Sequence, residues 1–152
     1  MKLAIALSQR AELQTRIRQL ESRLHNNALV QEGERPAEEP EELLNELEEC
    51  YAQLERLIAQ INRTNNETLV QGVRLSDLLA RRECGTGKLN VLRGFLDSAS
   101  NLVNRRTVGE IRIRSTVNVR ELQKQVDREA KALRELDSLI QEANWTTELV
   151  EH

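Results

Sequence analysis

Apolar residues recur every three or four positions in four stretches of the chain, which is the period of one helix face. This pattern predicts helices over about residues 3–29, 41–65, 75–103 and 119–143. Helices of roughly 25 residues are about 38 Å long. At that length they suit either a four-helix bundle or two antiparallel hairpins that need a partner chain.

The second stretch carries the broadest apolar face. Its apolar residues form two overlapping rows, one of Leu44, Leu47, Tyr51, Leu54, Ile58 and Ile61 and one of Leu43, Leu47, Cys50, Leu54, Leu57 and Ile61. Two such rows make a face wide enough to contact more than one neighbouring helix. The row in the first stretch is narrower, with Leu13, Ile17, Leu20 and Leu24.

Two glycine-containing segments interrupt the helical pattern. Residues 31–40 are acidic and contain Gly33 and two prolines, which predicts a loop. Gly85 and Gly87 fall inside the third stretch. Because glycine weakens a helix without ending it, we expect either continuity or a local kink at this point.

A different period appears at residues 108–117, where apolar and charged residues alternate as they do in a strand. One strand needs a partner, which is either 67–71 or the same strand of another subunit. The sequence thus predicts one mainly α domain over 1–152, with long antiparallel helices in a bundle or coiled coil and a short β element at about 67–71 and 108–117. The composition, 2% aromatic and 31% charged, is typical of long helices.

Export and membrane signals are weak in this sequence. No run of 18 apolar residues is long enough to span a membrane. The apolar patch at residues 3–7 is shorter than the core of a signal peptide. Cys50 and Cys84 are too few for a disulfide framework and are expected to be reduced thiols. We therefore expect a cytoplasmic protein.

The charge is distributed unevenly. The net charge is −3, but residues 31–49 hold nine acids and one arginine, whereas residues 105–134 hold nine basic and four acidic residues. Two interpretations remain open: solvated helix faces with an acidic loop, or docking of the acidic loop onto the basic segment. A mildly acidic chain with few aromatic residues is not expected to bind nucleic acid.

The sequence contains no convincing catalytic or metal-binding motif. The segment CGTGK at residues 84–88 lacks both the first glycine and the Ser or Thr of a phosphate-binding loop. His25 and His152 are the only histidines, and no Cys or His spacing matches a metal site. We predict no catalytic residue, no metal site and no cofactor, and expect that the protein is not an enzyme.

Two polar segments, INRTN at residues 61–65 and NWTTEL at residues 144–149, stand at predicted helix ends. Their Asn and Thr side chains suit helix capping, and the single Trp suits a packing anchor. Alternatively, the two segments share a polar pocket with nearby arginines. The candidate binding residues are then Asn62, Thr64, Asn65, Arg81, Arg82, Arg112, Asn144, Trp145 and Thr147.

These two segments, together with MKLAIALSQRAELQTRIRQL, VQEGERPAEEPEELL, LSDLLARR and STVNVRELQKQVD, carry a resemblance that runs nearly end to end. The chain resembles the septicolysin family of uncharacterised bacterial helical proteins. The segment CGTGKLNVLRG departs from the plain helix that such proteins would have there. The resemblance implies a small, mostly helical cytoplasmic protein that self-assembles, and it supplies no catalytic residues. The family name implies cytolysis.

We interpret the chain as a non-enzymatic, homo-oligomeric helical scaffold or protein-interaction protein. Its partner is a second copy bound through apolar helix faces, and a different protein partner is left open. Neither nucleic acid nor a membrane is an expected partner. The alternatives are a cytolysin-like membrane-active protein and a small-ligand or anion-binding protein.

Overall fold

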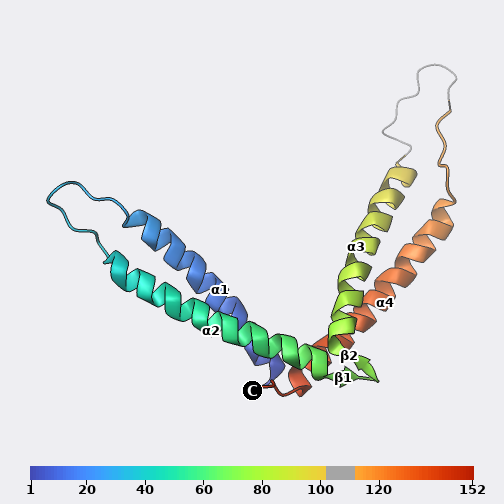
Figure 1. Ribbon diagram of the computed structural model, residues 1–152. Helices are drawn as coiled ribbons and strands as arrows, with labels where there is room; N and C mark the ends of the chain where they lie inside the picture. The colour runs from blue at the N-terminus through green and yellow to red at the C-terminus, as the bar shows by residue number, and fades with distance from the viewer. Residues whose placement is uncertain (102–111) are drawn as a thin grey trace. The chain divides into compact units, whose positions relative to one another are not determined.

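The computed structural model describes residues 1–101 and 112–152. Four long helices and one two-stranded sheet make up the described chain (Figure 1). The helices are α1 (Leu3–Asn26), α2 (Pro40–Glu67), α3 (Leu75–Ser100) and α4 (Val119–Thr146), and the strands are β1 (Leu69–Val70) and β2 (Val73–Arg74). The prediction of a mainly α protein with a short β element is therefore confirmed.

The chain divides into two compact units, which are described separately. One unit contains Met1–Arg74 and Ala143–His152, and the other contains Leu75–Glu142. The prediction of a single domain over residues 1–152 stays a prediction.

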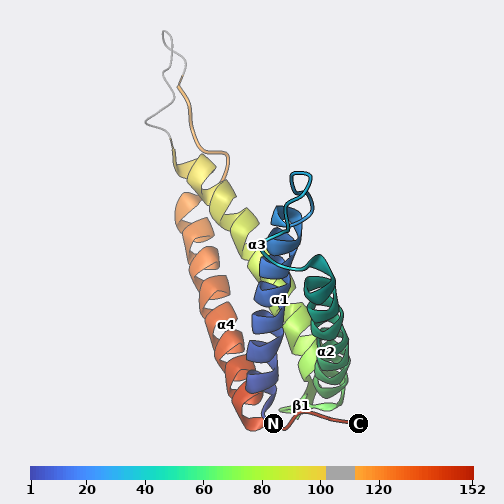
Figure 2. The ribbon, with the colours of Figure 1, turned by 90° about the vertical axis from the view of Figure 1, so that its left-hand side faces the viewer.

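In the first unit, α1 and α2 lie side by side as a hairpin (Figures 1 and 2). Leu20, Leu43 and Cys50 form the buried centre of this hairpin. Four partly buried residues pack around them: Leu13, Ile17, Leu24 and Leu47. The apolar row of α1 thus packs on the α2 row that contains Leu43 and Cys50, and this cluster includes none of the residues that belong to the other row alone.

The boundaries of α2 follow from local chemistry. Pro40 occupies the first turn, where its missing N–H is not needed, and Glu41 and Glu42 place negative charge at the positive end of the helix. At the other end Thr68 is extended, and its N–H donates to the Thr64 carbonyl. The helix is three residues longer than predicted, one at its beginning and two at its end.

The β element differs from the prediction. β1 pairs with β2 in a tight hairpin, with Leu69 opposite Arg74 and Val70 opposite Val73. Gln71 (φ 52°) and Gly72 (φ 80°) form its turn, and a two-residue hairpin turn favours positive φ at both positions. Within the described residues, β1 pairs with β2 and not with residues 112–117. The alternative, pairing of 108–117 with the same segment of another subunit, stays a prediction. Residues 112–117 lie in no strand of the described chain, and residues 108–111 lie outside the described residues.

In the second unit, α3 and α4 form another hairpin. Its buried centre contains Leu89, Leu96, Val126 and Ala130. Four partly buried residues pack around this centre: Leu92, Val119, Leu122 and Leu133. Two ion pairs join the helices, with Arg82 Nη1 2.9 Å from Asp137 Oδ1 and Lys88 Nζ 2.8 Å from Glu129 Oε1.

The glycines at 85 and 87 do not interrupt α3, which is continuous from Leu75 to Ser100. A Cβ added at Gly85 would lie 3.3 Å from Leu133 Cδ1, so the missing side chain leaves room for the Leu133 side chain of α4. Gly87 has no such neighbour. Of the two alternatives for this segment, continuity is the one observed.

Candidate interaction surfaces

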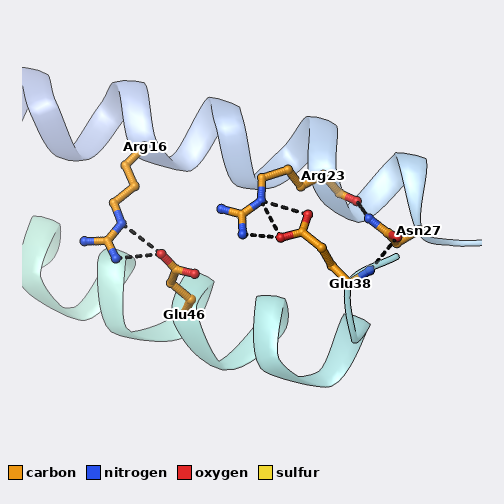
Figure 3. Close-up of polar contacts among 5 residues, drawn as sticks. All are labelled: Arg16, Arg23, Asn27, Glu38 and Glu46. Carbon is orange, nitrogen blue, oxygen red and sulfur yellow. Dashed lines mark hydrogen bonds and ion pairs between the residues drawn. The ribbon is translucent and has the colours of Figure 1, made fainter. Parts of the chain in front are cut away.

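The acidic loop between α1 and α2 is fixed to α1 by a small hydrogen-bond network (Figure 3). Asn27 is buried; its amide nitrogen donates to the Arg23 carbonyl (2.8 Å), and its Oδ1 accepts the Glu38 N–H (3.0 Å). Arg23 Nε donates to Glu38 Oε2 (3.0 Å), and this hydrogen bond holds the pKa of the Glu38 carboxyl below its usual value. These contacts also explain why α1 ends at Asn26, three residues earlier than predicted.

A second ion pair lies further along the same hairpin. Arg16 Nη2 is 2.6 Å and Arg16 Nε is 3.0 Å from the same carboxyl oxygen of Glu46 (Figure 3). Glu38 and Glu46, two of the nine acids in residues 31–49, therefore bind α1 of their own unit. They give no support to docking of the acidic loop onto residues 105–134.

The two predicted polar segments meet in the first unit. Thr64 is fully buried, and its hydroxyl donates to the Gln60 carbonyl (2.7 Å) while accepting the Val150 N–H (2.9 Å). Because this hydroxyl is already both a donor and an acceptor, it serves to join α2 to the C-terminal segment. Asn62 is exposed and Asn65 is half-buried.

The same C-terminal segment also binds the start of the chain. The Leu3 N–H donates to the Thr147 carbonyl (2.9 Å), and the Leu149 N–H donates to the Met1 carbonyl (2.8 Å). Lys2 Nζ lies 2.7 Å from Glu148 Oε1. We name residues 147–150 the closing segment, since it connects the first residues of α1 with the end of α2.

The remaining candidate residues are distributed between the two units. Asn144 is buried and Trp145 is exposed, both in the last part of α4. Arg81, Arg82 and Arg112 belong to the other unit. Arg82 is bound by Asp137, whereas Arg81 and Arg112 are exposed. Their common participation in a binding site stays a prediction.

The feature that the sequence did not reveal is the exposure of every aromatic side chain. The protein has one Tyr, one Phe and one Trp, and Tyr51, Phe95 and Trp145 are 51%, 46% and 62% exposed. Aromatic side chains normally supply much of a protein's buried apolar area. Here the described cores are aliphatic, and the aromatic residues lie on the surfaces of α2, α3 and α4.

One of these aromatic residues, Tyr51, lies in a longer apolar surface. On α2, Leu44, Tyr51 and Ile58 recur at intervals of seven; Leu44 and Tyr51 are exposed and Ile58 is half-buried. We name these three residues the α2 outer row. The sequence shows the apolar character of these three residues but not their exposure, because they belong to the apolar row of α2 that lies beside the Leu43 and Cys50 row.

Phe95 also borders a shallow groove of about 190 Å³, lined by Ser98, Ile113 and Arg114 among others. Within residues 1–101 and 112–152, no cluster of three or more His, Cys, Asp or Glu side chains could hold a metal ion. The same residues include no helix that is long and apolar enough to cross a membrane.

The described chain is built of paired long helices whose aromatic side chains are exposed. The chain belongs to a family of unknown function, DUF6847, whose model matches residues 10–149. It is similar to a functionally unknown conserved protein from Corynebacterium diphtheriae, with 40% sequence identity over 99% of both chains and a TM-score of 0.93. No curated protein matches it. Neither match carries the name septicolysin, so that relationship stays a resemblance.

Proposed function

We propose that this protein is a non-enzymatic scaffold that binds further copies of itself through exposed apolar helix surfaces. The observation that carries the proposal is the exposure of all three aromatic side chains. Tyr and Trp are enriched among the residues that dominate protein–protein binding energy, because they bury a large area with few rotatable bonds.

The packing of α2 supports the same proposal. α1 packs on the row that contains Leu43 and Cys50, and so leaves Leu44 and Tyr51 half-exposed. A helix of this length that is apolar on two adjacent sides is typical of one with neighbours on both. A second copy of the chain supplies a neighbour of the required apolar character.

The test is the solution mass by size-exclusion chromatography with light scattering, over a hundredfold range of protein concentration. We expect a mass that is a multiple of 17.5 kDa. Tyr51→Ser should raise the dissociation constant by about tenfold or more. The matched control is Gln53→Ser, an exposed neutral residue of α2 that borders a groove with α1 residues and lies outside the α2 outer row.

A mass of 17.5 kDa for the wild type at every concentration would contradict the proposal. An equal effect of Tyr51→Ser and Gln53→Ser would remove the α2 outer row from the interface. Circular dichroism of each variant separates a loss of binding from a loss of helix.

The two alternative functions give different results in simple assays. Leakage of anionic liposomes at low protein concentration would favour the membrane-active alternative that the septicolysin resemblance implies, acting through an amphipathic helix at the membrane surface. Saturable binding of phosphate, lost in Arg81→Ala or Arg112→Ala, would favour the anion-binding alternative. Arg82 supports that alternative least, because Asp137 already binds it.

A further inference from the structure

Three acidic residues lie on the same side of α2 as the α2 outer row, and we name them the α2 acidic row. Glu48 lies four positions after Leu44, which places the two side chains next to each other on the helix surface. Glu55 lies next to Tyr51 in the same way, and Glu41 continues the series towards the start of the helix. All three acids are exposed, and none belongs to an ion pair of the described residues. This side of α2 is therefore both apolar and negatively charged.

The α2 acidic row disfavours one simple neighbour, which is the same side of α2 in a second copy. If the two helices were parallel, Glu48 would lie beside Glu48 of the partner subunit. If they were antiparallel with Tyr51 at the centre, Glu48 would lie beside Glu55 of the partner subunit. Like charges brought together at an interface weaken binding. The α2 outer row therefore fits a neighbour that carries basic side chains.

One side of α4 carries such side chains. Val126 and Ala130 belong to the buried centre that α4 forms with α3. On the helix side away from them lie five exposed bases, which we name the α4 basic face: Arg120, Lys124, Arg128, Lys131 and Arg134.

Three acidic residues lie on or beside the α4 basic face. Asp127 and Glu135 are exposed on the same side of the helix, and Glu121 lies at its edge. Glu121 is 3.5 Å from Lys124, but exposed ion pairs of this kind contribute little. The five bases outnumber these acids, so the surface as a whole is positively charged.

We propose that the α2 outer row and the α2 acidic row bind the α4 basic face of a second copy. This proposal rests on the proposed function and names the two surfaces that form the contact. Each subunit has one surface of each kind, so one type of contact joins identical copies. Residues 41–55 of α2 and residues 120–134 of α4 each extend over about 21 Å of helix. Glu38 and Glu46 take no part, because each is already bound to an arginine of α1.

The spacing of the charges is the same on the two surfaces. Glu48 and Glu55 are seven positions apart, and so are Lys124 and Lys131. Two helices that pack side by side keep residues seven positions apart along one seam. Both carboxylates can therefore lie beside a lysine at the same time.

An antiparallel arrangement brings the two surfaces together without opposing like charges. It places Glu48 opposite the partner's Lys131. Tyr51 then lies opposite the partner's Arg128, and a guanidinium beside an aromatic ring is a favourable pair. The three acids on or beside the α4 basic face fall opposite uncharged residues of α2.

The principal test is charge reversal, measured by sedimentation velocity. Glu48→Lys/Glu55→Lys should raise the dissociation constant by about tenfold or more, because it brings like charges together. Lys124→Glu/Lys131→Glu should do the same. The variant that carries all four substitutions should associate nearly as tightly as wild type, since the facing charges are again opposite. A purely structural role of these four residues within their own subunit would not produce this recovery.

The matched control is Glu42→Lys/Glu49→Lys. These two acids are also exposed and seven positions apart on α2, but they lie on another side of the helix. Their replacement changes the net charge by the same amount as Glu48→Lys/Glu55→Lys and should leave the dissociation constant unchanged. Only variants that keep the helical circular dichroism of the wild type are compared.

The salt dependence gives an independent test. Raising the salt concentration from about 50 mM to about 500 mM should weaken the wild-type oligomer, because salt screens exposed charges. An oligomer that is equally tight at both concentrations would overturn the contact.

The other outcomes separate this contact from the proposed function. An oligomeric wild type that neither double reversal weakens, or a quadruple variant no tighter than the double variants, would overturn the contact but leave the proposed function standing. Binding of a DNA duplex that is lost in Lys124→Glu/Lys131→Glu, while self-association persists, would likewise overturn the contact and assign the α4 basic face to nucleic acid. A monomeric wild type would overturn both proposals.

Discussion

At the scale of single residues, Thr64 shows how one buried hydroxyl connects distant parts of the chain. It accepts the N–H of Val150, which is 86 positions away. Thr64→Val keeps the shape but leaves that N–H without its acceptor, which should lower the free energy of unfolding by about 1–3 kcal/mol. Urea denaturation monitored by circular dichroism measures this change.

Thr64→Ser is the matched comparison, because it removes a methyl group and keeps the hydroxyl. This variant should lower the free energy of unfolding by about 1 kcal/mol, as the loss of other single buried methyl groups does. A valine variant as stable as wild type would show that the bond to Val150 contributes nothing.

At the scale of elements, the Arg23–Glu38 pair joins the acidic loop to α1 and makes this part of the stability depend on pH. The hydrogen bond from Arg23 lowers the pKa of Glu38 below its ordinary value of 4.5. The contribution of the pair is therefore complete above that value and is lost as the pH falls through the lower pKa of the folded state.

Glu38→Gln tests this dependence. The difference in urea midpoint between wild type and Glu38→Gln should be constant above about pH 5 and should shrink towards zero at lower pH. Glu34→Gln, a loop residue that is exposed, is the control and should show no such trend. A difference between wild type and Glu38→Gln that is independent of pH would refute the role of the ion pair.

At the scale of the whole molecule, the closing segment joins residues that lie at the two ends of the sequence. Removing residues 147–152 deletes buried Leu149 and the hydrogen bonds to Met1, Leu3 and Thr64. Loss of the leucine alone should cost about 2 kcal/mol. The expected result is a thermal midpoint several degrees lower at fixed protein concentration. Removal of residues 151–152, which are exposed, should have little effect, and equal midpoints for the two truncations would contradict this role.

The sequence by itself determined the helices, because their apolar periods are long and regular. α2 and α4 agree with the predicted ranges within about three residues. The sequence indicates that residues 67–74 are extended with a turn at Gly72, but not that the two sides of this turn pair, because two-residue strands are too short for a period to appear. The predicted strand at 108–117 rested on local alternation alone, and its described part lies in no strand.

What only the tertiary structure decided is which apolar and polar residues are covered. Periodicity places Leu43 and Leu44 on adjacent rows of α2, but the direction of α1 determines that Leu43 is buried and Leu44 exposed. Likewise, polar Thr64 is buried in the fold, whereas aromatic Tyr51 lies on the surface. The physical reason is that a helix period is set by neighbours three and four positions apart, whereas burial is set by residues far away in the sequence.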